Sequence, residues 1–241
     1  MKIREDLRPM INHEPIKIPV TRRPLKAGQY YPEVTKKTLI IGHFSASDGT
    51  PEAVGDWFDS GGANYRDAAG NTVPVATAYS LGKDGKIIEM FDPEFWAVHL
   101  GASLSDEQRS IGIELVNAGP LRKRGEKFFW WPGNYSYEYT GRVYDNITDW
   151  RGFRYFAAFP VIQVESFARL TAYLIQRFKM NTRFVAGNLF LPGASALIGF
   201  AMHCNFRADK FDLGPAFQYE FFKREVMKHL QVPVLPDYET L

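Results

Sequence analysis

The chain has 241 residues, of which 45% are hydrophobic and 23% are charged, which excludes a disordered or fibrous protein and favours one domain with a sizeable core. Its formal net charge is +2, from 29 basic and 27 acidic residues, so no strong field supports binding to nucleic acid. The single cysteine, Cys204, excludes a disulfide within the chain.

The first segment, residues 1–36, is polar and contains prolines along its length. This composition predicts an extended arm packed on the domain. No uninterrupted apolar run that could serve as a signal-peptide core or a membrane span follows the N-terminal residues. We therefore expect a chain that is cytoplasmic as synthesised and does not insert into a membrane.

An early buried strand is predicted at residues 38–43, where the run Thr-Leu-Ile-Ile-Gly-His is β-branched and almost wholly apolar. A helix is expected soon afterwards, because Thr50 suits the capping position and Pro51 suits the first turn. Residues 76–81 and 86–90 flank a short glycine-bounded turn, which is typical of a β-hairpin.

A second buried strand is predicted at residues 111–115, and its alternation puts Gly112 and Glu114 on one face. Residues 118–159 are rich in Gly, Tyr, Trp, Arg and Asn without clear periodicity, and are expected to form a long irregular excursion over the surface. Apolar residues recur at helical spacing over 161–178, which predicts a helix packed on the sheet.

The last third of the chain continues this mixture of elements. Residues 198–203 alternate large and small side chains, so the face that carries His203 also carries Gly199 and Ala201 and leaves room beside the histidine. Pro215 is expected to open a final helix that runs to about residue 230. Because strands and helices intermix, the predicted fold class is α/β, a central mixed β-sheet flanked by helices.

Three of the five histidines, His43, His99 and His203, lie at or near predicted strand ends. A carboxylate, Asp212, follows His203 by nine positions, just before the expected last helix. A loop of that length can bring both side chains to one ion, and zinc commonly takes nitrogen and oxygen ligands with a fourth position open for water. A third protein ligand is then required.

Three motifs occur in order along the chain. An apolar strand ends in His43, a Ser-Ile-Gly-Ile-Glu-Leu strand occupies residues 110–115, and Lys-x-Asp-x-Gly-Pro at residues 210–215 follows His203. This order resembles the N-acetylmuramoyl-L-alanine amidases of the amidase type 2 family, relatives of the peptidoglycan recognition proteins. The resemblance covers roughly residues 37–230 and implies the fold of that family.

The resemblance also implies a zinc site and a reaction. The implied zinc ligands are His43, His203 and Asp212. Glu114 matches the general base of the family, and Lys210 matches the cation that steadies the oxyanion. The reaction implied is hydrolysis of the amide bond between the lactyl group of N-acetylmuramic acid and L-alanine in peptidoglycan.

Two further features of the sequence bear on the substrate groove and on the loop between His203 and Asp212. His99 matches a histidine that lines the substrate groove and is not a zinc ligand. The familiar Pro-Gly-Arg segment before the motif lysine is absent, and Arg207-Ala208-Asp209 stands there instead. Asp209 is therefore an alternative ligand.

Each assignment has a structural alternative. Glu114 could be a buried carboxylate paired with an arginine, because lone buried acids are costly. Lys210 could be a solvated loop charge, and Asp212 could cap the helix expected at Pro215.

The function expected from the sequence is a zinc-dependent peptidoglycan amidase, with residues 37–241 as the catalytic domain. The alternative function is a muropeptide-binding module without catalysis. We expect a monomer whose partner is peptidoglycan or a muropeptide. A phage lysin is favoured over a recycling or wall-remodelling enzyme.

Overall fold

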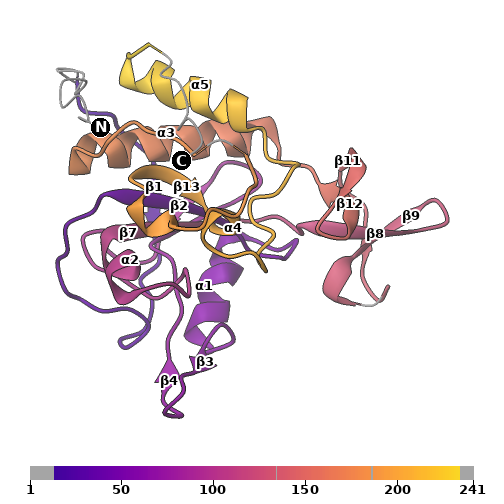
Figure 1. The fold of residues 1–241 in the computed structure, drawn as a ribbon, viewed down its shortest axis with the longest axis horizontal. Coiled ribbons are helices and arrows are strands. Elements are labelled where there is room, and N and C mark those ends of the chain that lie inside the picture. Colours follow the sequence, from indigo (N-terminus) through magenta and orange to yellow (C-terminus); the bar gives the residue numbers. More distant parts are fainter. Residues whose placement is uncertain (1–13, 134, 186, 234–241) are drawn as a thin grey trace.

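The computed structural model of the protein describes residues 14–133, 135–185 and 187–233. Its centre is a six-stranded mixed β-sheet, in the order β1-β6-β5-β7-β2-β13, with helices on both faces (Figure 1). This arrangement confirms the predicted α/β class. The strands are β1 (Val20–Arg22), β2 (Leu39–Phe44), β5 (Tyr79–Leu81), β6 (Ile87–Glu89), β7 (Ser110–Leu115) and β13 (Gly199–Met202).

The middle of the sheet is parallel. Strand β2 lies between β7 and β13, and Ile41 pairs with Gly112 on one side and with Ala201 on the other. The first three residues of β2 are fully buried, as expected of a strand covered on both faces. The C-terminal ends of neighbouring parallel strands lie along the same edge of the sheet, so His43 and His203 are placed close together there.

The other half of the sheet contains the predicted hairpin and a strand from the predicted arm. Strands β5 and β6 pair antiparallel, which confirms the hairpin. Strand β1 pairs in parallel with β6, so part of the arm forms the edge of the sheet. The backbone N–H of Ile16 donates to the Gln176 side chain at 2.7 Å and ties the arm to a helix. Residues 1–13 lie outside the described residues.

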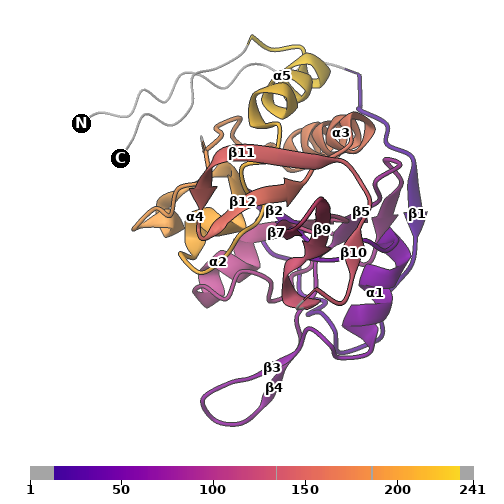
Figure 2. The same ribbon diagram turned by 90° about the vertical axis from the view of Figure 1, so that its right-hand side faces the viewer.

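Helices α3 (Val161–Phe178) and α5 (Tyr219–Leu230) stack on one side of the sheet, and α1 (Pro51–Asp59) and α2 (Leu104–Arg109) lie on the other (Figures 1 and 2). The bounds of α3 are those predicted from its apolar spacing. Helix α1 also begins as predicted, because the Thr50 side chain accepts a hydrogen bond from a backbone N–H in the first turn.

The last helix begins later than predicted, at Tyr219 instead of Pro215. Gly214 has a φ of +78°, and the Phe217 N–H donates to the Gly214 carbonyl oxygen at 3.2 Å, so a turn precedes the helix. Helix α5 therefore leaves Asp212 outside its capping position. That result removes the alternative in which Asp212 serves only as a helix cap.

The structure differs from the prediction for residues 118–159. They form a five-stranded antiparallel sheet, in the order β10-β9-β8-β12-β11, which projects from the main domain (Figure 1). Its strands are β8 (Pro120–Arg124), β9 (Lys127–Trp130), β10 (Glu138–Tyr139), β11 (Val143–Trp150) and β12 (Phe153–Ala157), with a 3-10 turn at Trp131–Gly133.

Aromatic side chains on both faces of this antiparallel sheet hide the strand pattern in the sequence. Phe128 and Phe129 are consecutive in β9, yet Phe128 packs on Tyr155 and Phe129 packs on Tyr135. Consecutive apolar residues give no alternation of period two, so the usual signal of a half-buried strand is missing. The pairing of β11 with β12 also shifts register after Asp145.

The remaining elements are short. They are the hairpin of β3 (Tyr65–Arg66) and β4 (Thr72–Val73), helix α4 (His203–Phe206) and a 3-10 turn at Ala194–Ala196. Within the described ranges, no helix combines the length and the apolar character needed to span a bilayer.

Lys37, just before β2, gives a pH-dependent test of the fold. Its ammonium is buried and donates to the carbonyl oxygen of Gln108 at 2.7 Å, and burial lowers the pKa of Lys37 to about 7. An unfolded lysine holds its proton to higher pH, so the unfolded chain binds more protons between about pH 7 and 10. The free energy of unfolding should therefore rise with pH in that window.

Urea unfolding of the wild type and Lys37→Met at pH 7 and pH 9 measures the contribution of Lys37 to the free energy of unfolding. The wild type should gain about 1–2 kcal/mol relative to Lys37→Met at the higher pH. Lys36→Met, which changes the exposed neighbour, is the control and should follow the wild type. An equal pH response in the wild type and Lys37→Met would contradict a lowered pKa of the buried Lys37 ammonium.

Candidate metal centre

The two histidines predicted as metal ligands lie on neighbouring parallel strands. His43 is in β2, and His203 follows β13 directly as the first residue of α4. Met202 is the register partner of Gly42, so the next residue of each strand stands at the same edge of the sheet. The two histidines are almost fully buried, with exposed fractions of 4% and 5%.

Asp212 reaches the same edge through the loop that follows α4. The backbone N–H of Cys204 donates to the carbonyl oxygen of Asp212 at 2.9 Å, which closes this loop. The next side chain, Leu213, packs on Gly42, where an added Cβ atom would lie 2.8 Å from Leu213 Cδ1. The absent side chain in β2 therefore makes room for the loop that delivers Asp212 beside His43.

Three candidate ligand atoms form a compact triangle. His43 Nδ1 and His203 Nδ1 are 3.0 Å apart, and Asp212 Oδ2 lies 3.2 Å from the first and 2.9 Å from the second. In a tetrahedral zinc site with ligands about 2.0–2.1 Å from the ion, ligand atoms are about 3.3 Å apart. The triangle therefore matches one face of such a tetrahedron, and its nitrogen and oxygen donors are ones that zinc binds.

The charges at the triangle suit a cation. Burial and the neighbouring His203 lower the pKa of His43 to about 4, so the ring is neutral at physiological pH. Burial opposes ionisation of Asp212, but His203 and His43 outweigh it and hold the pKa of Asp212 well below its usual range. A neutral imidazole and a carboxylate are the forms in which these groups bind a metal.

The far sides of the histidine rings bond to the protein. His203 Nε2 donates to the carbonyl oxygen of Leu100 at 3.0 Å. His43 Nε2 lies 2.9 Å from Nδ1 of His99, and Nε2 of His99 lies 2.9 Å from the Ser110 hydroxyl. Such outer hydrogen bonds orient the rings of metal-binding histidines.

His99 lies behind the triangle and contributes no atom to it. Its ring meets the ring of His43 edge on, with 5.0 Å between centroids, and 8% of the residue is exposed. Both ring nitrogens bond to the protein, so a substrate could touch only ring carbons. The role of His99 in the substrate groove stays a prediction.

Glu114 lies beside His43, because the two residues are register partners in β7 and β2. Its side chain is half-buried, and no arginine among the described residues forms an ion pair with it. Burial and the Asp212 carboxylate raise the pKa of Glu114 to about 8, against a smaller opposite effect of Lys210. A carboxylate with a raised pKa beside a candidate metal centre has the properties of a general base.

Lys210 and Asp209 differ in their relation to the triangle. Lys210 is half-buried, and its positive charge contributes to the lowered pKa of His43, so it acts on the site electrostatically. Asp209, the alternative ligand, is exposed and accepts hydrogen bonds from Arg207 at 3.0 and 2.7 Å. Its carboxylate is thus used away from the triangle.

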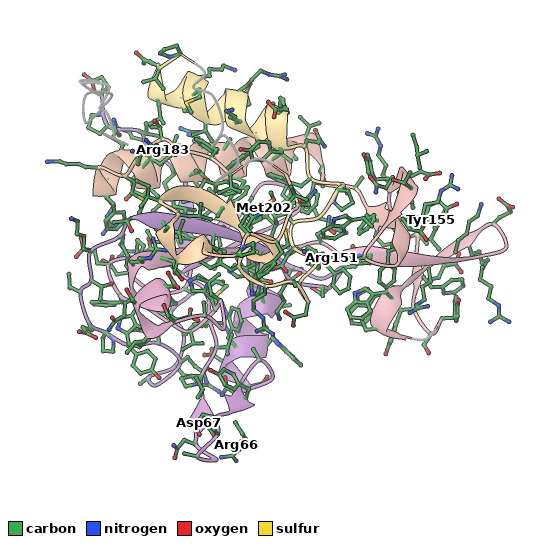
Figure 3. All side chains as sticks on the ribbon, in the orientation of Figure 1. Arg66, Asp67, Arg151, Tyr155, Arg183 and Met202 are labelled. Carbon is green, nitrogen blue, oxygen red and sulfur yellow. The ribbon has the colours of Figure 1, made fainter. Side chains whose placement is uncertain are left out.

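A contact that the sequence did not reveal joins the antiparallel sheet to the loop between α4 and Asp212. Arg151, after β11, donates to the carbonyl oxygen of Lys210 and, at 3.5 Å, to those of Arg207 and Cys204. Figure 3 shows Arg151 between this sheet, where Tyr155 is labelled, and the main domain, where Met202 is labelled. The antiparallel sheet therefore braces the loop that ends at Asp212.

Comparisons with known proteins identify a family for this chain. The sequence profile of a family described as N-acetylmuramoyl-L-alanine amidase matches residues 33–214. A comparison with curated protein sequences gives no match.

Solved structures share the fold at low sequence identity. A selenomethionine derivative of AmpD is 19% identical, with a TM-score of 0.51 over 86% of this chain and 94% of its own. The N-acetylmuramoyl-L-alanine amidase LysC from Clostridium intestinale URNW is 13% identical, with a TM-score of 0.50 over 90% of this chain and 100% of its own. The endolysin amidase LysCS from the same organism is also 13% identical, with a TM-score of 0.50 over 90% of this chain and 99% of its own.

The triangle predicts a measurable metal affinity. Asp212→Ala removes one of the three candidate ligand atoms and the only carboxylate among them, so the affinity for zinc should fall by about 100-fold or more. Competition with a chromophoric chelator measures the dissociation constant. Asp209→Ala removes a nearby carboxylate of the same loop and should leave the affinity unchanged; the opposite ranking of the two variants would make Asp209 the ligand.

Proposed function

The chain belongs to the N-acetylmuramoyl-L-alanine amidase family, and from this premise we propose that it is a zinc-dependent hydrolase of peptidoglycan. The proposed bond is the amide between the lactyl group of N-acetylmuramic acid and L-alanine. The observation that carries the proposal is the buried triangle of His43, His203 and Asp212 with Glu114 beside it. The substrate is peptidoglycan or a muropeptide derived from it.

The proposed zinc ligands are Nδ1 of His43, Nδ1 of His203 and Oδ2 of Asp212. A zinc ion bound there would lower the pKa of a water molecule and polarise the amide carbonyl. His43 lies in β2, His203 is the first residue of α4, and Asp212 lies in the loop after α4. Three protein ligands would leave a fourth coordination position for water or substrate. Two neutral imidazoles and one carboxylate would carry one negative charge, so a bound zinc ion would leave the site with a net positive charge.

Glu114 is the proposed general base. Its carboxylate accepts a proton from the attacking water as the oxygen bonds to the amide carbon. The same residue then delivers the proton to the alanine nitrogen as the carbon–nitrogen bond breaks, which yields a lactyl carboxylic acid and a free amine. A raised pKa favours this role, because the ionised carboxylate is then a stronger base than that of an exposed glutamate. The positive charge of a bound zinc ion would favour the ionised form that the role requires.

Lys210 is the proposed stabiliser of negative charge. As water adds to the amide, charge accumulates on the carbonyl oxygen, and a fixed ammonium close to that oxygen lowers the barrier. Lys210 is supported by its position in the loop that ends at Asp212 and by its electrostatic influence on both His43 and Glu114. The Arg151 bond to the carbonyl oxygen of Lys210 would help to hold this loop in place.

The alternative function is a module that binds muropeptides without cleaving them. Such a module needs neither a complete ligand set nor a basic carboxylate, whereas this chain has both His43–His203–Asp212 and Glu114. The amidase is therefore the better supported function. A phage lysin is the proposed setting, and faster action on intact walls than on soluble muropeptides would support it over a recycling enzyme.

Glu114→Gln tests the mechanism. The amide cannot accept the proton of water, so kcat/KM on purified peptidoglycan should fall by about 100- to 10,000-fold. The zinc affinity should stay close to that of the wild type, because Glu114 is outside the triangle. Glu138→Gln, at an exposed position in β10, is the matched control and should keep full activity.

Mass spectrometry of the wild-type digest identifies the bond. The expected products are stem peptides with a free alanine amine and glycans with free lactyl groups. Full activity of Glu114→Gln would contradict the mechanism, and products cut at another bond would contradict the substrate assignment.

A further inference from the structure

We propose that the loop from His99 to Ala102 places a proton on Nε2 of both candidate metal-binding histidines, so that Nδ1 of each ring is the nitrogen left to bind a cation. This inference rests on the metal site of the proposed function. It assigns a positioning role to His99, to the Leu100 carbonyl group and to Glu107, which holds the loop. None of the three lies in the triangle of candidate ligand atoms.

The proton positions follow from a chain of hydrogen bonds that begins at Ser110. The Ser110 hydroxyl lies 2.6 Å from the carbonyl oxygen of Asp106. A carbonyl oxygen can only accept, so the single hydroxyl hydrogen is directed there. The Ser110 oxygen must then accept from His99 Nε2, which lies 2.9 Å away. His99 is therefore protonated on Nε2 and has a lone pair on Nδ1.

The same reasoning applies to His43. Its Nε2 lies 2.9 Å from Nδ1 of His99, and only one of these two atoms can donate. Because Nδ1 of His99 has no proton, Nε2 of His43 must have one. The neutral ring of His43 then presents a lone pair on Nδ1, the atom that points at the triangle. Three residues thus fix one tautomer through consecutive bonds.

The second ligand is fixed by the neighbouring residue of the same loop. His203 Nε2 donates to the carbonyl oxygen of Leu100 at 3.0 Å, which places a proton on Nε2 and leaves Nδ1 as the nitrogen that faces Asp212 Oδ2 at 2.9 Å. Leu100 has no exposed surface and belongs to a core cluster with Leu39, Ile41 and Ala201. The carbonyl group therefore has little freedom to turn away from His203.

Glu107 of α2 holds the loop itself. Its buried carboxylate accepts hydrogen bonds from four consecutive backbone N–H groups, those of His99, Leu100, Gly101 and Ala102, at distances between 2.8 and 3.3 Å. A carboxylate that gathers four amides fixes the backbone on which both outer contacts depend. The acid is thus engaged with the loop and not with the metal triangle.

Gly112 makes room for the ring of His99 in this chain of hydrogen bonds. Ser110, Gly112 and Glu114 share one face of β7, and the ring of His99 lies over Gly112. A Cβ atom at Gly112 would come within 3.0 Å of His99 Cγ and Nδ1. A side chain at this position would displace the ring that contacts His43.

Two variants of similar shape separate the acceptor from simple packing. His99→Asn keeps an oxygen close to the place of Nδ1, whereas His99→Leu has no acceptor there. Long-range ¹⁵N–¹H NMR of the metal-free proteins reports the tautomer of His43, and chelator competition reports the zinc dissociation constant. Wild type and His99→Asn should keep the proton on Nε2 of His43 and agree in zinc affinity within about three-fold.

His99→Leu should give a mixture of the two His43 tautomers and weaken zinc binding by about 10- to 100-fold. If His99→Leu does not fold, Ser110→Ala replaces it, because the loss of the Ser110 oxygen frees His99 to change tautomer. Glu107→Gln should disturb both His43 and His203, since it loosens the whole loop.

Two outcomes would overturn the proposal. One is an unchanged tautomer and zinc affinity in His99→Leu or its replacement. The other is equal losses in His99→Asn and His99→Leu, which would assign His99 a packing role. Failure of the wild type to bind zinc would instead refute the proposed metal site, while the NMR of the metal-free protein would still decide the tautomers.

Discussion

The structure depends on a constraint at one edge of the central sheet, where two imidazole nitrogens and a carboxylate oxygen lie within 3.2 Å of one another. Buried acceptors crowded in this way repel one another and have lost water, so the arrangement is costly unless a cation lies among them. The parallel pairing of β2 with β13 places two of these atoms, and the loop after α4 places the third. Much of the surrounding packing serves to keep them there.

Two carboxylates at this edge have pKa values that are shifted in opposite directions. Asp212 faces two histidines, which hold its pKa far below the usual range and keep it ionised as a ligand. Glu114, in the strand next to that of His43, receives no such stabilisation, and burial together with Asp212 raises the pKa of Glu114 to about 8. Different pKa values in adjacent acids are a mark of divided chemical roles. The antiparallel sheet adds a brace through Arg151, so the part of the chain that looked least organised supports the site.

Sequence patterns were sufficient where one physical rule dominates. Apolar spacing located α3, and an unbroken apolar run located β2, because each reflects burial alone. The antiparallel sheet was missed because aromatic side chains on both faces remove the alternation. The start of α5 was missed because a turn after Gly214 competes with the helix-opening preference of proline. The triangle of His43, His203 and Asp212 was anticipated from a motif resemblance, whereas the outer bonds of Leu100 and Glu107 involve backbone groups that no sequence pattern marks.

Anomalous X-ray scattering at the zinc absorption edge, from crystals grown with zinc, tests the central claim most directly. The account predicts a single strong peak about 2.0–2.2 Å from Nδ1 of His43, Nδ1 of His203 and one oxygen of Asp212. It would be contradicted by a peak that lies elsewhere, or by coordination through Nε2 of either histidine.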